Sequence, residues 1–210
     1  MKRVVSIAED GPEAAGLALS ATLAAGGVAV FPADGLYGLA CDPMRADAIA
    51  RLHALKGRDD GKPSAVLFFS PLILRELISS LGEPTRTALP ALLPGPVTVV
   101  VHNPEHRYPL ACREDPERLG IRLIEGPLTG VATPLFQTSA NLSGEPAPSR
   151  FSDVPAGIIE GANLAIDGGE LTGQPSTVVD VTALEKGGGW SILRDGGMPA
   201  SEVERRLGTL

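Results

Sequence analysis

Two short pairs of polar residues in this sequence are suited to binding the phosphates of a nucleotide. The first pair, Lys56 and Arg58, is separated by one glycine and follows a segment with helical periodicity. If the chain is extended here, side chains two positions apart point the same way, so that both cations can hold one polyphosphate group. The alternative interpretation is a solvated helix end, which needs no ligand.

The second pair is Ser139 and Asn141, which are separated by one alanine and follow the apolar run 135–138. Hydroxyl and amide groups both donate and accept hydrogen bonds, so this pair is suited to phosphate oxygens or a ribose. The alternative is a turn or a helix cap, because Ser and Asn are common at both. Both pairs stand at the ends of predicted elements, which is where we expect the site.

Spacing excludes several other chemistries. Residues 57–63 resemble a phosphate loop, but only three residues separate the two glycines and a proline stands where a Mg²⁺-binding hydroxyl belongs. The sequence has no Gly-x-Ser-x-Gly nucleophile elbow, and its three histidines form no local signature around a nucleophile. His53 and His102 are predicted to be structural or surface residues. Cys41 is predicted to be a small hydrophobic residue and not a nucleophile.

The charge balance limits the class of partner. The 210 residues include 18 Lys and Arg against 25 Asp and Glu, for a net charge of −7. A negative chain repels phosphates at long range, so nucleotide binding requires a local cationic pocket, and general affinity for DNA is not expected. Cys41 and Cys112 lie far apart without metal-ligand spacing, which argues against zinc and disulfides and favours the cytoplasm. Neither a signal peptide nor a membrane span is predicted.

The hydrophobic pattern predicts alternating strands and helices. Residues 12–25 are rich in Ala and Leu between a proline and a glycine pair, and residues 45–56 and 72–81 repeat apolar residues at helical spacing. Apolar runs predict strands at 4–7, 28–31, 65–69, 97–102, 120–123, 135–138, 164–167, 177–181 and 191–194. We expect an α/β fold in which one mixed sheet is covered by helices, as a single domain over residues 1–210. Residues 187–189 are expected at an exposed hairpin tip.

Seven short segments of the sequence follow one another in a recognisable order. They are FPADGLYGL at 31–39, LKGR with KP at 55–63, PGPVT at 94–98, GIRL at 120–123, TSANLSG at 138–144, PSTVVD at 175–180 and ILRDG at 192–196. In order and spacing they resemble the YrdC-like family, the threonylcarbamoyl-AMP synthases, over residues 12–200. The Lys-x-Arg and Ser-x-Asn pairs are together the catalytic signature of that family.

The resemblance implies a fold and a reaction. The fold is a twisted mixed sheet with flanking helices around a concave nucleotide-binding cavity. The reaction joins L-threonine, bicarbonate and ATP, which brings Mg²⁺ with it, to give threonylcarbamoyl-AMP and pyrophosphate. The product would supply the threonylcarbamoyl modification of the tRNA adenosine next to the anticodon, through a downstream transferase complex.

The same resemblance implies roles for particular residues. The residues implied in catalysis and ATP binding are Lys56, Arg58, Ser139 and Asn141, with Arg194 as a further phosphate contact. The residues implied in binding the amino acid are Asp34, Tyr37, Arg122 and Ser176. No metal ligand is implied in the protein itself, because Mg²⁺ arrives with ATP.

The first segment departs from the family pattern. The family usually has threonines on both sides of the acidic residue, one of which helps to hold the threonine substrate, whereas this chain has Ala33 and Gly35. Ala147 stands where a serine near the nucleotide is common. A site without the hydroxyl discriminates weakly between similar substrates, so we expect an altered amino-acid pocket beside retained phosphate-binding residues.

Two alternatives to this enzyme stay open. The first is a non-enzymatic YrdC-like protein that binds nucleotide or double-stranded RNA in the same cavity. The second is carbamoyl transfer, as in the related domain of hydrogenase-maturation proteins, although the acylphosphatase and zinc-finger segments that accompany that domain are missing from this sequence. The sequence ends soon after the seventh segment, which predicts the short form of the family.

Overall fold

Alternating side chains on the central strands separate a packed face of the sheet from an open one. In the computed structural model, which describes residues 3–57 and 62–208, strands β5 (Val97–His102) and β6 (Arg118–Leu123) are neighbours. Their odd-numbered residues are buried in the larger hydrophobic cluster. Residues 98, 100, 118, 120 and 122 instead line a cavity on the opposite face. The alternation follows from the two-residue repeat of a strand.

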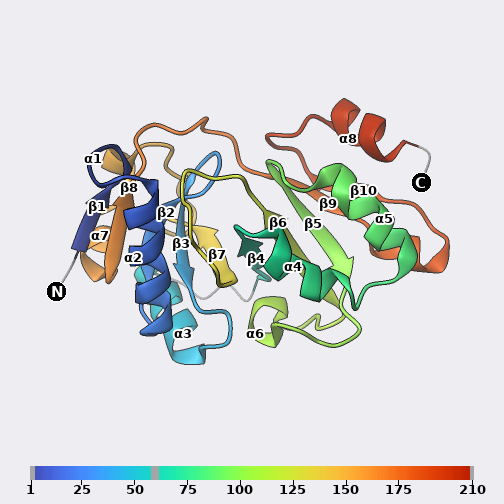
Figure 1. Cartoon of the computed structure of the whole chain (residues 1–210), viewed down its shortest axis with the longest axis horizontal. Helices are drawn as coiled ribbons and strands as arrows, with labels where there is room; N and C mark the ends of the chain where they lie inside the picture. The colour runs from blue at the N-terminus through green and yellow to red at the C-terminus, as the bar shows by residue number, and fades with distance from the viewer. Residues whose placement is uncertain (1–2, 58–61, 209–210) are drawn as a thin grey trace.

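The ten strands of the described residues form one mixed sheet in the order β1-β8-β2-β3-β7-β4-β6-β5-β9-β10 (Figure 1). The pairs β1–β8, β2–β8, β4–β6 and β5–β9 are parallel, and the other neighbouring strands of the sheet are antiparallel. The remaining strands are β1 (Arg3–Ser6), β2 (Ala29–Pro32), β3 (Tyr37–Cys41), β4 (Ala65–Phe68), β7 (Leu135–Ser139), β8 (Leu164–Asp167), β9 (Thr177–Asp180) and β10 (Ser191–Arg194). The predicted α/β class with a mixed sheet is confirmed.

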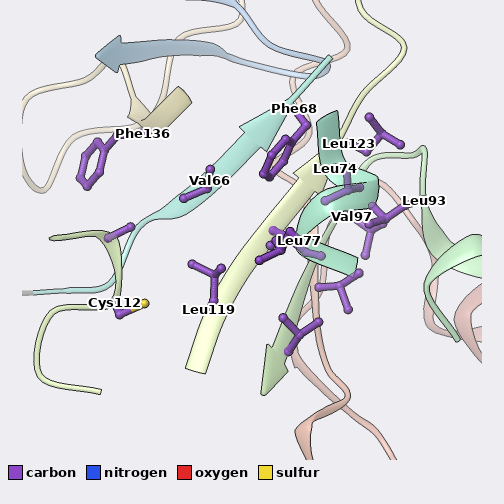
Figure 2. Close-up of a cluster of buried hydrophobic side chains, with 14 of the residues drawn as sticks. Val66, Phe68, Leu74, Leu77, Leu93, Val97, Cys112, Leu119, Leu123 and Phe136 are labelled. Carbon is purple, nitrogen blue, oxygen red and sulfur yellow. The ribbon is translucent and has the colours of Figure 1, made fainter. Parts of the chain in front are cut away.

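Helices cover one face of this sheet and only part of the other. The larger hydrophobic cluster joins the packed face to α3 (Ala46–Leu55), α4 (Pro71–Ile78), α5 (Glu83–Leu92), α6 (Pro109–Cys112), α7 (Ala156–Gly161) and α8 (Ala200–Leu207). Figure 2 shows Leu74 and Leu77 of α4 against side chains of β4 and β6. On the opposite face, α2 (Pro12–Ala24) contacts β1, β2 and β8, and a smaller cluster includes residues 124–131. The uncovered remainder of that face is the cavity.

Three short elements complete the structure. Helix α1 (Ile7–Asp10) precedes α2, and the 3-10 helices η1 (Phe151–Asp153) and η2 (Thr182–Lys186) flank β8 and β9 in the sequence. Residues 187–189 are exposed, as expected, but they follow η2, so the connection from β9 to β10 is longer than a tight hairpin tip. None of the helices in residues 3–57 and 62–208 is long and apolar enough to cross a lipid bilayer.

The predicted strands agree with the structure to within two residues at each end, but several elements were not predicted. Strand β3 was not recognised because its sequence contains Gly38, and glycine is uncommon inside strands. Helix α5 was not recognised because it contains Pro84 and Pro90, of which the second lies inside the helix. Helices α6, α7 and α8 are short. Strand β6 begins at Arg118, two residues before the predicted start.

Gly16 provides a test of the packing of α2 against residues 124–131. A Cβ atom at position 16 would lie 1.8 Å from the carbonyl oxygen of Thr129. Gly→Ala inside a helix ordinarily stabilises by roughly 0.5–1 kcal/mol, but a backbone clash of this kind costs about 1–3 kcal/mol. We therefore expect Gly16→Ala to lower the free energy of unfolding, measured by urea denaturation.

Gly157 in α7 is the matched control, because a Cβ atom there would meet no atom within 4 Å. We expect Gly157→Ala to leave the stability unchanged or to raise it by up to about 1 kcal/mol. A Gly16→Ala protein that is as stable as the Gly157→Ala protein would contradict the close approach of α2 to Thr129.

The two cysteines allow a chemical test of the core. Cys41 and Cys112 are buried free thiols. Burial raises the pKa of Cys41 to about 12 and also raises the pKa of Cys112. Because the thiolate is the reactive form, we expect neither thiol to react with DTNB at pH 8 in the native protein, and both to react after unfolding in guanidinium chloride. Rapid reaction of native Cys41 would show that the predicted hydrophobic role is wrong.

Candidate active site

The cavity on the open face has a volume of about 550 Å³. Its floor is formed by β4, β5, β6, β7 and β9, and its walls include residues 33, 34, 36 and 37 and residues 174–176. Of the nine residues expected at the site, six line this cavity: Asp34, Tyr37, Arg122, Ser139, Ser176 and Arg194. Lys56 and Asn141 lie beside Ser139, as described next, and Arg58 lies outside the described residues.

The Lys56 ammonium connects the end of α3 to the end of β7. Its Nζ donates to the carbonyl oxygens of Ser139 and Asn141 and to Asn141 Oδ1, the last at 3.1 Å. The Ser139 hydroxyl lies 3.4 Å from Nζ and donates to Asn141 Oδ1. Lys56 lies more than 80 positions before Ser139 and Asn141 in the sequence, yet the three residues form one polar cluster at the edge of the cavity.

The local backbone differs from the extended chain assumed for the Lys56 segment. Lys56 is the last residue of the α3 turn, with φ −81° and ψ −4°, and Gly57 follows with φ +73°. The assumption of an extended segment is wrong at these two residues. Gly57 is required because it ends the helix in the left-handed region, which residues with a Cβ atom rarely adopt.

Asn141 organises the cluster. Its side-chain amide donates to the carbonyl oxygens of Leu142 and Glu145, at 2.9 and 2.7 Å. Its Oδ1 accepts from both Lys56 and Ser139. Since an amide side chain offers two donors and two acceptor positions, all are occupied. Asn141 therefore orients the Lys56 and Ser139 side chains and has no remaining hydrogen-bonding capacity for a ligand in this arrangement.

A buried ion pair lies on the floor of the cavity. Arg122 Nη2 lies 2.6 Å from Asp34 Oδ1, and the two side chains are 6% and 23% exposed. Arg122 Nη1 donates to Gln137 Oε1 at 3.0 Å. Arg122 Nε and Asp34 Oδ2 are also buried, and neither has a hydrogen-bond partner among the described residues. An unmet buried polar group costs roughly 1–3 kcal/mol, so both atoms favour a polar ligand.

Arg194 supplies a positive charge without a nearby carboxylate. Its Nη2 donates to the Ser176 carbonyl at 2.7 Å and to Ser176 Oγ at 3.1 Å, and it forms no ion pair within the described part of the chain. Ser176 Oγ lies 2.8 Å from Thr98 Oγ1. Partial burial lowers the pKa of Arg194, and the charge of Arg122 lowers it further. An anion bound between these two arginines would relieve both effects.

Tyr37 supports the wall of the cavity. Its hydroxyl donates to the Gly169 carbonyl at 2.7 Å and accepts from Gly168 N at 2.9 Å. Burial raises the pKa of this phenol to about 12. The hydroxyl therefore ties β3 to residues 168–169, at the start of the segment that continues to Ser176. These contacts fix the position of the Tyr37 side chain, which also lines the cavity, and its contact with an amino acid stays a prediction.

The structure explains why position 35 is a glycine. A Cβ atom there would lie 2.0 Å from the carbonyl oxygen of Gln174, and Gly173 N donates to the Gly35 carbonyl at 2.9 Å. No side chain fits between these segments. Ala33 and Ala147 both line the cavity with methyl groups. The chain therefore offers no hydroxyl from positions 33, 35 or 147.

Seven further polar residues line the cavity and were not predicted as site residues: Ser64, Thr98, Asp115, Arg118, Gln137, Thr138 and Gln174. The available signal was the two-residue repeat of the strands, because Arg118 and Arg122 have the same parity on β6. Placing the start of β6 at residue 120 left Arg118 outside the strand. Among the residues with described positions, no group of three or more His, Cys, Asp or Glu side chains is arranged to hold a metal ion.

Comparison with known proteins identifies relatives along most of the chain. Residues 21–196 match the Sua5/YciO/YrdC family model, described as "Telomere recombination". A threonylcarbamoyl-AMP synthase of Xanthomonas campestris is 33% identical over 182 residues, covering 83% of this chain and 94% of the relative. A threonylcarbamoyl-AMP synthase of Pyrococcus abyssi is 29% identical over 196 residues, but this chain spans only 55% of that relative's length.

Solved structures show the same fold. The structure of P. abyssi Sua5 complexed with L-threonine superimposes with a TM-score of 0.79 at 26% identity, covering 99% of this chain and 61% of that one. E. coli YciO superimposes with a TM-score of 0.76 at 19% identity, covering 97% of this chain and 98% of that one. With a family model that spans most of the sequence and relatives that share its fold, this chain belongs to the Sua5/YciO/YrdC family.

Proposed function

We propose that this protein is a threonylcarbamoyl-AMP synthase, which uses ATP, bicarbonate and L-threonine. The observation that carries the proposal is the cluster of Lys56, Ser139 and Asn141 at the edge of a cavity that also contains Arg122 and Arg194. Relatives named threonylcarbamoyl-AMP synthase support it, as does the P. abyssi Sua5 structure with L-threonine.

The proposed reaction is a nucleotidyl transfer. The amine of threonine forms a C–N bond with the carbon of bicarbonate, and water leaves to give a carbamate. An oxygen of this carbamate attacks the α-phosphorus of ATP; the bond between this phosphorus and the bridging oxygen to the β-phosphorus breaks, and pyrophosphate leaves. The substrate supplies the nucleophile, so the protein needs no catalytic triad. It must align the reacting groups and stabilise the charge on the triphosphate. Mg²⁺ enters as part of the ATP complex.

The phosphate side of the site is assigned to the cluster at the end of α3. Lys56 and Arg58 hold the triphosphate, Ser139 contacts the nucleotide, and Asn141 keeps Lys56 and Ser139 in place. Arg194 is a further phosphate contact. A cation oriented by fixed oxygens before the ligand arrives needs little reorganisation, which is the condition for strong electrostatic stabilisation.

The amino-acid side is assigned to the floor and the opposite wall. Arg122 Nε and Asp34 Oδ2, the unmet buried atoms of the ion pair on the cavity floor, form a donor and an acceptor for the carboxylate and the N–H of an amino acid. Ser176 contacts the same substrate, and Tyr37 positions the segment that carries Ser176. We place the whole site within one domain over residues 1–210, since every described strand joins one sheet.

The wider role follows from the product. Threonylcarbamoyl-AMP is consumed by a transferase complex that modifies the tRNA adenosine next to the anticodon, and we place this reaction in the cytoplasm. The alternative of a non-enzymatic nucleotide- or RNA-binding protein is not favoured by any of the relatives, and a net charge of −7 opposes general RNA binding. An RNA-binding protein of that kind would lose RNA affinity steeply as the salt concentration rises.

The phosphate assignment is tested by Lys56→Ala and Arg58→Ala. Each variant loses a cation that neutralises the triphosphate, so we expect the rate of pyrophosphate release from ATP, bicarbonate and threonine to fall by at least about 100-fold. Lys186→Ala removes an exposed lysine at the end of η2 and serves as the matched control. Wild-type rates in both the Lys56→Ala and the Arg58→Ala protein, with unchanged thermal unfolding, would remove the assignment.

The amino-acid pocket is tested by comparing threonine with its isostere valine. Because positions 33 and 35 offer no hydroxyl, we expect the kcat/KM for pyrophosphate release with valine to lie within about 100-fold of that with threonine. A site that hydrogen-bonds the substrate hydroxyl would instead discriminate by roughly 10⁴-fold or more. Discrimination of that size would show that another group replaces the missing hydroxyls, and equal inactivity with all amino acids would contradict the enzyme itself.

A further inference from the structure

Strand β6 presents two arginines to the cavity. Arg118 and Arg122 are four residues apart on the same face, which corresponds to about 13 Å along a strand. The Arg122 side chain is 6% exposed and pairs with Asp34 on the cavity floor, whereas the Arg118 side chain is 41% exposed. Arg118 therefore lies nearer the solvent than Arg122 does, and none of the expected substrate contacts involves it.

The register of the sheet places Arg118 at the same end of the cavity as Ser139. Ala65 of β4 pairs with Gln137, and it lies level with Gly120 because Val66 pairs with Ile121 in the parallel β4–β6 ladder. Two residues further toward the N-terminal end of β4, the neighbouring residue on β7 is Ser139 and the residue at the same level on β6 is Arg118. Only β4 lies between these strands, so two interstrand spacings, about 10 Å, separate their backbones.

Asp180 orients the Arg118 guanidinium but leaves one of its N–H donors without an acceptor among the described residues. Arg118 Nη2 donates to Asp180 Oδ2 across β5, and Arg118 Nε lies 3.9 Å from Asp115 Oδ2, too far for a hydrogen bond. Arg118 Nε is buried and has no hydrogen-bond partner in the part of the chain that is described. The other oxygen of Asp180 accepts from the backbone and hydroxyl of Thr182. The guanidinium is thus oriented and keeps an unused donor.

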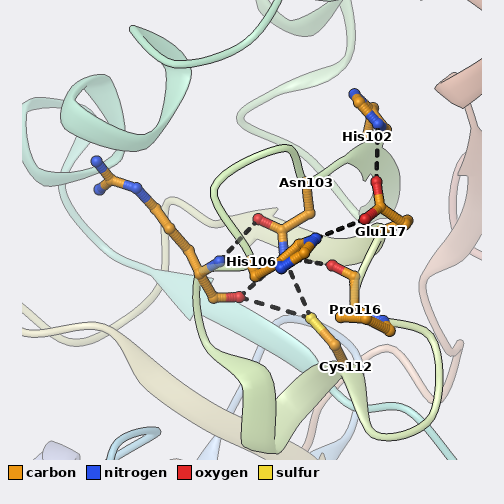
Figure 3. Close-up of polar contacts among 7 residues, drawn as sticks. His102, Asn103, His106, Cys112, Pro116 and Glu117 are labelled. Atoms are coloured by element: carbon orange, nitrogen blue, oxygen red, sulfur yellow. Dashed lines mark hydrogen bonds and ion pairs between the residues drawn. The ribbon is translucent and has the colours of Figure 1, made fainter.

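The loop before β6 holds this strand end in place (Figure 3). Asn103 Nδ2 donates to the Arg107 and Pro116 carbonyls at 3.0 and 2.9 Å, and Asn103 N donates to the Glu117 carbonyl at 2.8 Å. The Glu117 carboxylate also contacts His102 and His106. Residues 103–117 are therefore tied together immediately before Arg118, which reduces the cost of ordering its side chain around a ligand.

We propose that Arg118 binds the polyphosphate of the nucleotide from the side of the cavity opposite to Lys56. The inference rests on the proposed function, because it assigns a further cation to the triphosphate beside Lys56, Arg58 and Arg194. A guanidinium forms paired hydrogen bonds with phosphate oxygens, and its exposed position lets it contact the pyrophosphate as that group leaves toward solvent.

The test compares Arg118→Gln with Arg118→Lys. For Arg118→Gln we expect kcat/KM for ATP in pyrophosphate release to fall at least 10-fold and the KM for the amino acid to change less than twofold. Arg118→Lys keeps the charge and is expected to recover part of the loss. In calorimetry, Arg118→Gln is expected to weaken tripolyphosphate binding at least 10-fold and to leave adenosine binding unchanged, which a general structural defect would not do.

Arg86→Gln is the matched control, because Arg86 is an exposed residue of α5 paired only with Glu83 in the described structure. The proposal is overturned if Arg118→Gln binds tripolyphosphate and uses ATP like the Arg86→Gln protein. It is equally overturned if only the KM for the amino acid rises, since Arg118 would then bind a carboxylate.

If the wild-type protein releases no pyrophosphate, the proposed function fails, and the tripolyphosphate measurement still decides the role of Arg118. If Arg118→Gln does not fold, the Arg118→Lys protein is measured in its place. The proposal is then overturned if Arg118→Lys binds tripolyphosphate with the same affinity as the wild type at both low and high salt.

Discussion

The contact of the Lys56 ammonium with Ser139 and Asn141 is the interaction on which the site depends. It joins the C-terminal end of α3 to the end of β7, and its acceptors are two carbonyl oxygens and an amide oxygen. These oxygens orient the ammonium through their dipoles and hold it at the edge of the cavity. A cation held in this way can attract a phosphate strongly once water is excluded.

The cavity exists because one face of the sheet lacks a complete helical cover. On the packed face the strands meet six helices through apolar side chains, whereas on the other face α2 and residues 124–131 cover only part of the sheet. Alternate strand positions line the uncovered part, and they include the polar residues Thr98, Arg118, Arg122 and Gln137 beside the apolar Val100 and Val178. Arg122 is tolerated there because Asp34 and Gln137 satisfy part of its guanidinium, and its unmet Nε is a cost that binding of a polar ligand would offset.

The charge distribution reconciles a negative protein with a polyanionic ligand. The net charge is −7, but the cavity contains Arg118, Arg122 and Arg194, and Lys56 lies at its edge. Asp34 pairs with Arg122, and Asp115 and Asp180 both pair with Arg118, which leaves Arg194 without an ion-pair partner among the residues described. The positive charge is therefore local, as a specific nucleotide site requires and as a general nucleic-acid surface would not provide.

The sequence by itself determined nine of the ten described strands, the class of fold, the family and the residue types of the phosphate cluster. These depend on local information: the two-residue repeat of apolar side chains, glycine and proline at element ends, and short motifs in a fixed order. The tertiary structure decided which of these residues share an environment. Four findings depend on strand register and on contacts between residues far apart in the chain. The hydrogen-bonding groups of Asn141 are all occupied, Tyr37 binds the backbone at 168–169, residue 174 leaves no space for a side chain at Gly35, and Arg118 lies level with Ser139. Such contacts leave no periodic signal in the sequence, because each forms only when the strands have paired.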